Sequence, residues 1–261
     1  MLEDETHLNA PGTIAFFTVS GSVIWVVIGG LVAGDAATRD IQTRMHPLTY
    51  TPPVSKVSYL IAQFLAALVL NALILLTLYA GFLLSFYGPG AKIQFLGPFR
   101  LASYLTNYAF LALPTVMVTT AIQFTFAALS GRAIASHIVS ILIIIFSQFG
   151  GTTVRFMLEW KVLGSLMDLF GTSIVADMEG WTPIDKNTRL ILLQGTWLWN
   201  RIVWFGMATG ALAFTYFRLR LGHVTNARRW SFFRYQPESV HPASKVSLDA
   251  SHISNNDTPV Q

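Results

Sequence analysis

The sequence predicts an all-α, polytopic membrane protein with about five transmembrane helices. Its 261 residues are 53% hydrophobic and only 11% charged, whereas roughly 25% of the residues of a typical soluble domain are charged. Residues 9–34 and 57–91 contain no Asp, Glu, Lys or Arg. About 20 mainly apolar residues cross the ~30 Å of hydrocarbon in a bilayer, so each of these two runs is long enough to span it.

Charge-free windows predict five spans in chain order. They cover residues 12–33, 58–87, 105–129, 133–149 and 196–217. The second is long enough to tilt, and Pro114 predicts a kink in the third. Only Gly131 and Arg132 separate the third span from the fourth, so these two form a hairpin. Residues 1–230 therefore form the transmembrane domain.

The last 31 residues, 231–261, contain few large apolar side chains. Such a segment cannot bury a core, and we expect a disordered cytoplasmic tail. With no Cys anywhere, disulfides and thiolate metal sites are excluded. No metal site and no nucleic-acid partner is expected, because the net charge of +4 follows membrane orientation rather than a basic surface patch.

Counting Lys and Arg near the spans orients the bundle. The loop after the first span has three, the hairpin has one and the segment after the last span has five, against six on the other side. This bias places the first loop and the C-terminus in the cytoplasm and the N-terminus outside. The acidic stretch 1–11 has no apolar signal to carry it across, so a preceding span missing from this chain is expected, with a reverse-anchor first span as the alternative.

The order of the elements resembles a known family. A charged loop reading RD…TPPVSKVSYLIAQFLAAL precedes a long span and a hairpin, and LLQGTWLWNRIVWFG leads into the last span. This is similar to the membrane permease of type-2 ABC exporters, nearest to the bacterial branch sometimes fused to a zinc aminopeptidase. The five spans would be spans two to six of six. No HExxH motif occurs, so peptidase activity is not carried over.

The resemblance implies a permease in the bacterial inner membrane that works as a homodimer or with a second permease half. Such a permease would not itself be an enzyme, and no catalytic residues or cofactor are expected in it. Because no G-x-x-x-x-G-K-[ST] motif occurs, ATP would be bound and hydrolysed by a separate cytoplasmic ATPase subunit.

Residues 34–56 are the predicted contact with that ATPase. If residues 35–45 form a helix, three charged side chains should be exposed on it, and Pro47, Pro52 and Pro53 should end it. The alternative is an ordinary solvated loop whose cations only orient the spans. The candidate coupling residues are Arg39, Asp40, Arg44, His46, Pro52, Pro53 and Lys56.

Polar residues inside the predicted spans are candidates for a transport pathway or for bonds between helices. We expect packing for most of them. His137 could serve a proton relay, although no carboxylate lies in any span to pair with it. Arg201 is expected to extend outward to Glu159, Asp168 or Glu179. The set comprises Asn71, Asn107, Gln123, His137, Gln148 and Arg201.

Two G-x-x-x-G motifs, Gly30/Gly34 and Gly206/Gly210, permit close helix approach. Packing within the chain is the favoured use of both, and a dimer face is the alternative.

Short external helices are expected before the last span. Arg155 and Glu159 have the spacing of a helical ion pair, and Thr182 followed by Pro183 predicts a new helix start.

Other functional classes have weaker support. An intramembrane protease would need a paired nucleophile and base or a metal motif, and neither occurs. A secondary transporter usually has ionisable groups or broken helices near the midplane of the membrane, and apart from Pro114 the predicted spans have neither. A truncated or accessory membrane subunit without transport of its own is the third alternative.

Overall fold

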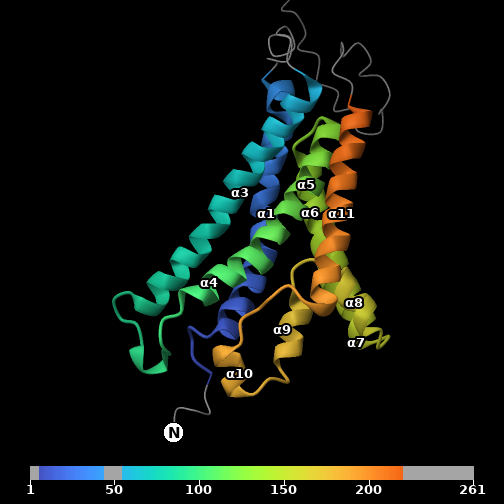
Figure 1. Cartoon of the computed structure of the whole chain (residues 1–261). Helices are drawn as coiled ribbons and strands as arrows, with labels where there is room; N and C mark the ends of the chain where they lie inside the picture. The colour runs from blue at the N-terminus through green and yellow to red at the C-terminus, as the bar shows by residue number, and fades with distance from the viewer. Residues whose placement is uncertain (1–5, 44–54, 220–261) are drawn as a thin grey trace, which may run out of the picture. The chain divides into compact units, whose positions relative to one another are not determined.

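Four long helices and a fifth, less apolar one make up the bundle (Figure 1). The computed structural model describes residues 6–43 and 55–219, and these contain helices and turns but no strand. The long α-helices are α1 (Pro11–Gln42), α3 (Lys56–Tyr87), α5 (Leu113–Ser130), α6 (Ile134–Ile144) and α11 (Gly195–Arg218). The shorter ones are α4 (Leu101–Asn107), α7 (Thr152–Phe156), α8 (Lys161–Met167), α9 (Thr172–Met178) and α10 (Pro183–Thr188), with a 3-10 turn η1 (Ile93–Phe95).

Two π-helical segments join shorter pieces into continuous spans. η2 (Tyr108–Ala112) connects α4 to α5, and η3 (Ile145–Gly151) connects α6 to α7. Pro114 lies in the first turn of α5, directly after η2. Because proline lacks an N–H, it is tolerated where the helical hydrogen-bond pattern is already interrupted, and the predicted kink in the third span stays a prediction. The fourth span runs to Phe156, beyond the predicted end at residue 149.

Four helical stretches are long and apolar enough to cross a membrane: Pro11–Asp40, Lys56–Tyr87, Leu101–Ser130 and Ile134–Phe156. The all-α, multi-pass class is therefore confirmed. The fifth predicted span corresponds to α11, whose 24 residues would reach about 36 Å. Trp197, Asn200 and Arg201 make its first half less apolar, so its crossing of the membrane stays a prediction.

Helix α5 occupies the centre of the bundle and contacts α1, α3, α6 and α11. Most of its buried side chains are small or medium-sized, and Val116, Ala121 and Phe124 are almost completely enclosed. Helix α3 is packed on one side only. Its other side exposes leucines such as Leu73 and Leu84, which is the surface that a lipid-facing helix needs.

The two G-x-x-x-G motifs lie in different surroundings. A Cβ atom on Gly34 would be 2.9 Å from the carbonyl oxygen of Ala133, and one on Gly30 would be 2.5 Å from Ser140 Oγ. This pair therefore packs against the α6 hairpin, and the internal-packing prediction is confirmed. Among the described residues, no atom apart from the helix's own nearby backbone lies within 4 Å of a Cβ built on Gly206 or Gly210, so for this pair the internal-packing prediction is wrong.

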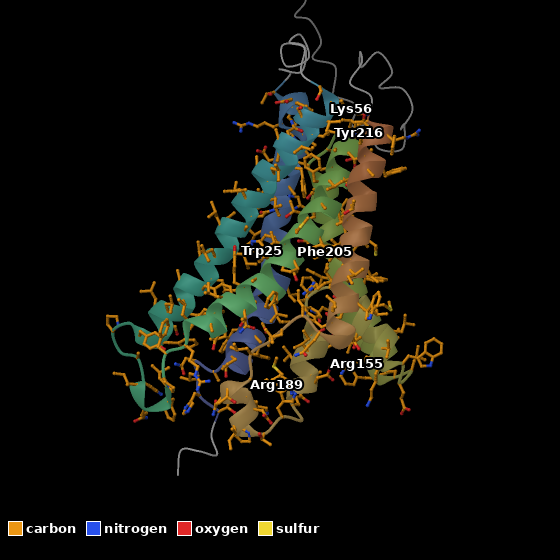
Figure 2. The ribbon with its side chains drawn as sticks, viewed as in Figure 1. Trp25, Lys56, Arg155, Arg189, Phe205 and Tyr216 are labelled. Carbon is orange, nitrogen blue, oxygen red and sulfur yellow. The ribbon has the colours of Figure 1, made fainter. Side chains whose placement is uncertain are left out.

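Three labelled cations mark the two ends of the bundle. Lys56 lies beside Tyr216 at one end, whereas Arg155 and Arg189 lie at the other (Figure 2). The α5–α6 turn and the end of α11 share the first end, and the N-terminal segment shares the second with α7 to α10 (Figure 1). Successive long helices therefore run in opposite directions, as the predicted order of spans requires.

Candidate functional site

The predicted coupling segment begins as part of a span. Helix α1 continues without interruption from Pro11 to Gln42, so residues 35–42 do not form a separate helix after a loop at residue 34. Arg39 is exposed near the end of α1, as predicted. Arg44, His46, Pro52 and Pro53 lie outside the residues that the structure describes.

Asp40 is not the free surface charge that was predicted. Its carboxylate accepts a hydrogen bond from the Tyr59 hydroxyl at 2.6 Å and a longer one from Gln63 Nε2 at 3.3 Å. Gln63 Nε2 also donates to the Tyr59 oxygen at 2.7 Å. Both partners belong to the first turns of α3, so Asp40 holds the end of α1 against the start of α3.

Lys56 connects the start of α3 to the end of α11. Its ammonium donates to the Tyr216 carbonyl and lies 4.6 Å from the centroid of the Tyr216 ring (Figure 2). The last carbonyls of a helix have no partner within the helix and attract cations. Ser55 caps the same turn by accepting a bond from the Ser58 N–H. The Asp40 and Lys56 contacts together link α1, α3 and α11 at one end of the bundle.

Three of the predicted intramembrane amides are completely buried and bond helices together. Asn71 Nδ2 donates to Thr120 Oγ1 at 3.0 Å and to the Gly29 carbonyl at 3.3 Å. Gln123 Nε2 donates to the Val26 carbonyl and to Ser140 Oγ, both at 2.8 Å.

Asn107 Nδ2 donates to the carbonyls of Ser103 and Pro11. The packing interpretation therefore accounts for the NH2 groups of the three amides, whereas their side-chain oxygens are buried without a hydrogen-bond partner among the described residues. His137 and Gln148 are half-buried, and no hydrogen bond of theirs joins the described helices.

Arg201 is buried, with 1% of its surface exposed, so the predicted outward extension is wrong. Of the three carboxylates named for it, Asp168 lies near enough for its charge to interact with Arg201, without a direct ion pair between them. Nη1 donates to the Leu169 carbonyl at 2.9 Å, and Nη2 is 3.4 Å from Thr115 Oγ1. The guanidinium carbon lies 3.7 Å from the centroid of the Trp197 ring. A cation over an aromatic face is favoured when both are desolvated. Arg201 is thus bound by backbone oxygen and an aromatic ring.

The neighbours of Arg201 on α11 bind the C-terminal end of α8 and the start of the loop that follows it. Asn200 Nδ2 donates to the Asp168 carbonyl at 2.6 Å and to the Ser165 carbonyl at 2.8 Å. Trp204 Nε1 donates to the Leu166 carbonyl at 3.1 Å. These carbonyls would otherwise be buried without a donor, at a cost of about 1–3 kcal/mol each. We refer to Asn200, Arg201 and Trp204 as the loop clamp.

Sequence reasoning found only one member of this clamp. Asn and Trp near a helix end are common in interfacial positions, so neither residue carried a specific signal. The remaining clue is their spacing, because residues at positions i, i+1 and i+4 of a helix lie close to one face.

Asp168 serves the loop instead of forming an ion pair. Its carboxylate accepts bonds from the N–H groups of Phe170, Gly171 and Ser173 and from the Ser173 hydroxyl, at 2.6 to 3.1 Å. The loop is therefore fixed from within by Asp168 and from outside by the clamp.

The other short helices test two local predictions. Arg155 pairs with Asp177 of α9 rather than with Glu159, because α7 ends at Phe156 and Glu159 has a positive φ of 57°. The helix start at Pro183 is confirmed. Thr182 accepts a bond from the Asp185 N–H at 3.2 Å.

No family model, curated protein or solved structure matches the chain. Within residues 6–43 and 55–219, no group of three His, Cys, Asp or Glu side chains could hold a metal ion. Among the described residues, the buried amides donate to neighbouring helices, Arg201 donates to the loop after α8, and Asp40 and Lys56 link the ends of α1, α3 and α11.

Proposed function

We propose that this chain is the membrane permease of an ATP-driven exporter of the ABC type, coupled to a separate cytoplasmic ATPase. The observation that carries the proposal is the linkage of three helices at one end through Asp40 and Lys56. The chain between α1 and α3 starts and finishes at this end. A force applied there would therefore reach two candidate spans and α11 together.

The closed interior supports a permease that needs a partner half. Asn71, Asn107 and Gln123 are buried and bonded to neighbouring helices, so they line no open route through the described bundle. A pathway would then form between this chain and a second copy or a second permease half. The open face at Gly206 and Gly210 on α11 is available for such a contact.

The proposed orientation puts the linked end in the cytoplasm. A reporter that is active only in the cytoplasm should show activity when fused after Lys56 or after Arg218, and none when fused after Asp185 in α10. The first two positions lie at one end of the bundle and the third lies at the other (Figure 1). Activity at Asp185 would contradict the orientation and remove the coupling proposal with it.

The coupling proposal predicts the effect of reversing two charges. Arg39 is exposed, so Arg39→Glu together with Arg44→Glu should leave the bundle intact while opposing an ATPase surface that complements these cations. Typical costs of breaking interfacial charge pairs suggest a loss of about 2 to 3 kcal/mol, or roughly 30- to 150-fold in binding. The measurement is the ATP hydrolysis activity that co-purifies with the tagged full chain from native membranes.

The matched control reverses two cations at the opposite end, Lys161→Glu with Lys186→Glu, and should retain the co-purifying activity. Membrane abundance of all variants should stay near that of the wild type. Unchanged ATPase recovery in the Arg39/Arg44 variant would refute the coupling site. Background hydrolysis with the wild type would favour the accessory subunit without transport.

A further inference from the structure

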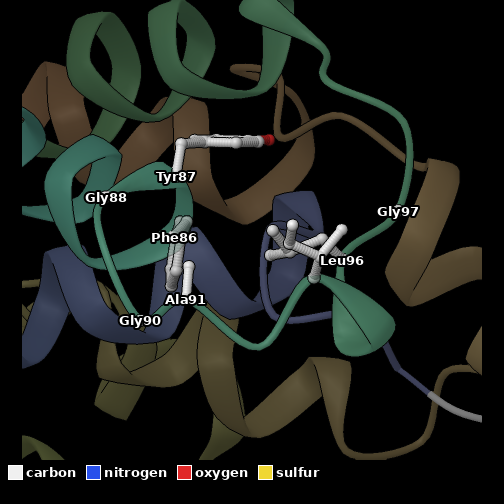
Figure 3. A pocket seen from close by; sticks show the side chains of 8 residues that line it. Phe86, Tyr87, Gly88, Gly90, Ala91, Leu96 and Gly97 are labelled. Atoms are coloured by element: carbon white, nitrogen blue, oxygen red, sulfur yellow. The ribbon is translucent and has the colours of Figure 1, made fainter.

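A cavity of about 320 Å³ lies where α3 ends, away from the linked end (Figure 3). Phe86 and Ala91 face Leu96 across the space, and the Tyr87 ring extends over it (Figure 3). Every residue that lines the cavity is glycine, apolar or aromatic, and none is charged. A space with this lining suits hydrocarbon rather than an ion or a sugar.

Asn9 fixes the frame of this cavity. It is 5% exposed, and its Nδ2 donates to the Tyr87 hydroxyl and to the Gly97 carbonyl, both at 2.8 Å. Its Oδ1 accepts from the Gly97 N–H, also at 2.8 Å. Tyr87 and Gly97 both line the cavity, so the side-chain amide of Asn9 fixes the distance between these two parts of its wall. The cavity is therefore pre-formed.

The surroundings of the cavity favour lipid as its occupant. On the last turns of α3, Leu83 and Leu84 are exposed, and the exposed fraction of Leu84 is 71%. Beyond the cavity, Ile93 is 77% exposed and Phe99 is 55% exposed. Exposed apolar side chains on a membrane-spanning helix face lipid tails. An acyl chain could thus reach the cavity from the bilayer past these exposed apolar side chains.

The charged residues within the segment that lines the cavity are both cations. Lys92 lies between two lining residues, Ala91 and Ile93, and Arg100 lies three residues beyond Gly97. Both cations are exposed, and residues 88–101 contain no Asp or Glu. Cations at a membrane surface attract the phosphates of anionic lipids. The same segment therefore has cations that suit a lipid phosphate next to an apolar cavity that suits an acyl chain.

We propose that this segment binds one anionic phospholipid, with an acyl chain in the cavity and the phosphate at Lys92 and Arg100. The proposal does not depend on transport, because an accessory membrane subunit with this fold would bind the same lipid.

The test uses the purified full chain in detergent and native mass spectrometry with added phosphatidylglycerol or phosphatidylcholine. We expect one retained phosphatidylglycerol per chain, and weaker retention of the neutral lipid. Ala91→Trp should fill the cavity and lower retention of both lipids at least tenfold. Lys92→Gln with Arg100→Gln should lower phosphatidylglycerol retention roughly 25-fold, about fivefold for each cation, and leave phosphatidylcholine unchanged.

Three controls distinguish a specific lipid site from general lipid contact. Lys161→Gln with Lys186→Gln removes the same charge at this end of the bundle and should change retention less than twofold. Inorganic phosphate should not displace the lipid, because a free anion has no acyl chain. A phosphatidylglycerol with a photoreactive acyl chain should label residues 86–97 in the wild type, which does not require any variant to fold.

Equal retention by Ala91→Trp and the wild type would overturn the proposal, as would equal retention of the two lipids. Photolabelling no stronger at residues 86–97 than at the lipid-facing middle of α3 would overturn it as well.

Discussion

Arg201→Ala is expected to lower the free energy of unfolding by about 3–5 kcal/mol. The substitution empties a buried volume of several methylene groups beside Trp197. It also removes the shorter of the two hydrogen bonds to the buried Leu169 carbonyl, leaving only the one from Thr115 Oγ1 at 3.2 Å. Because the loop after α8 is held by the same clamp, Asn200 and Trp204 should bind it less well. The measurement is reversible unfolding of the detergent-solubilised chain in a denaturant titration.

Two other substitutions show whether the loss comes from the clamp. Arg218→Ala removes an exposed arginine from the same helix and should change stability by no more than about 0.5 kcal/mol. Arg201→Lys should recover only part of the loss, because an ammonium cannot lie flat on Trp197 while bonding the loop as a guanidinium does. If Arg201→Ala unfolds like the wild type, the clamp is not important for stability. Normal stability with abolished transport would instead indicate contact with the substrate.

Gly34→Leu is the second substitution with a large expected effect, and we expect it to cost about 3 kcal/mol. A Cβ at this position would lie 2.9 Å from the Ala133 carbonyl oxygen and 3.1 Å from Ser136 Cβ. Because the first obstacle is backbone, rotation of a side chain cannot relieve the clash, and α1 must move away from α6. That movement would break the bond that Ser136 Oγ donates to the Gly30 carbonyl at 2.7 Å.

The matched control for Gly34→Leu lies in the second glycine motif. Gly210→Leu adds the same atoms to a helix surface with nothing within 4 Å, so stability should stay within about 0.5 kcal/mol of the wild type or rise slightly, since leucine favours helix more than glycine. Equal destabilisation by both substitutions would contradict the packing of Gly34 against α6. A change in oligomeric state with Gly210→Leu alone, measured by light scattering, would identify the α11 face as a contact between copies.

The sequence by itself was enough to find the four apolar spans. The predicted range 58–87 lies within two residues of the observed helix Lys56–Tyr87, and the predicted starts and ends of the first and third also fall inside observed helices. The reason is that lipid imposes a local requirement. Each span must satisfy its own backbone and carry about 20 apolar residues, and both conditions can be read without knowing the neighbours.

Local chemistry also determined the start of α10. The Thr182 cap and the proline after it act within one turn, so no distant residue could overrule them. The Arg155–Glu159 pair failed for the opposite reason. A pair four residues apart needs a continuous helix between its members, and α7 ends at Phe156, three residues before Glu159.

Only the tertiary structure decided where the polar side chains act. The sequence around Asp40 predicts a charge on the surface, yet its hydrogen-bond partners are on α3. Arg201 donates to the Leu169 carbonyl, 32 residues away in the chain. The two glycine motifs show the same limit, since Gly34 packs against α6 while Gly210 faces outward. A motif within one helix describes the shape of a surface. Which helix meets that surface depends on how all the spans pack, and that packing is decided by contacts between residues far apart in the sequence.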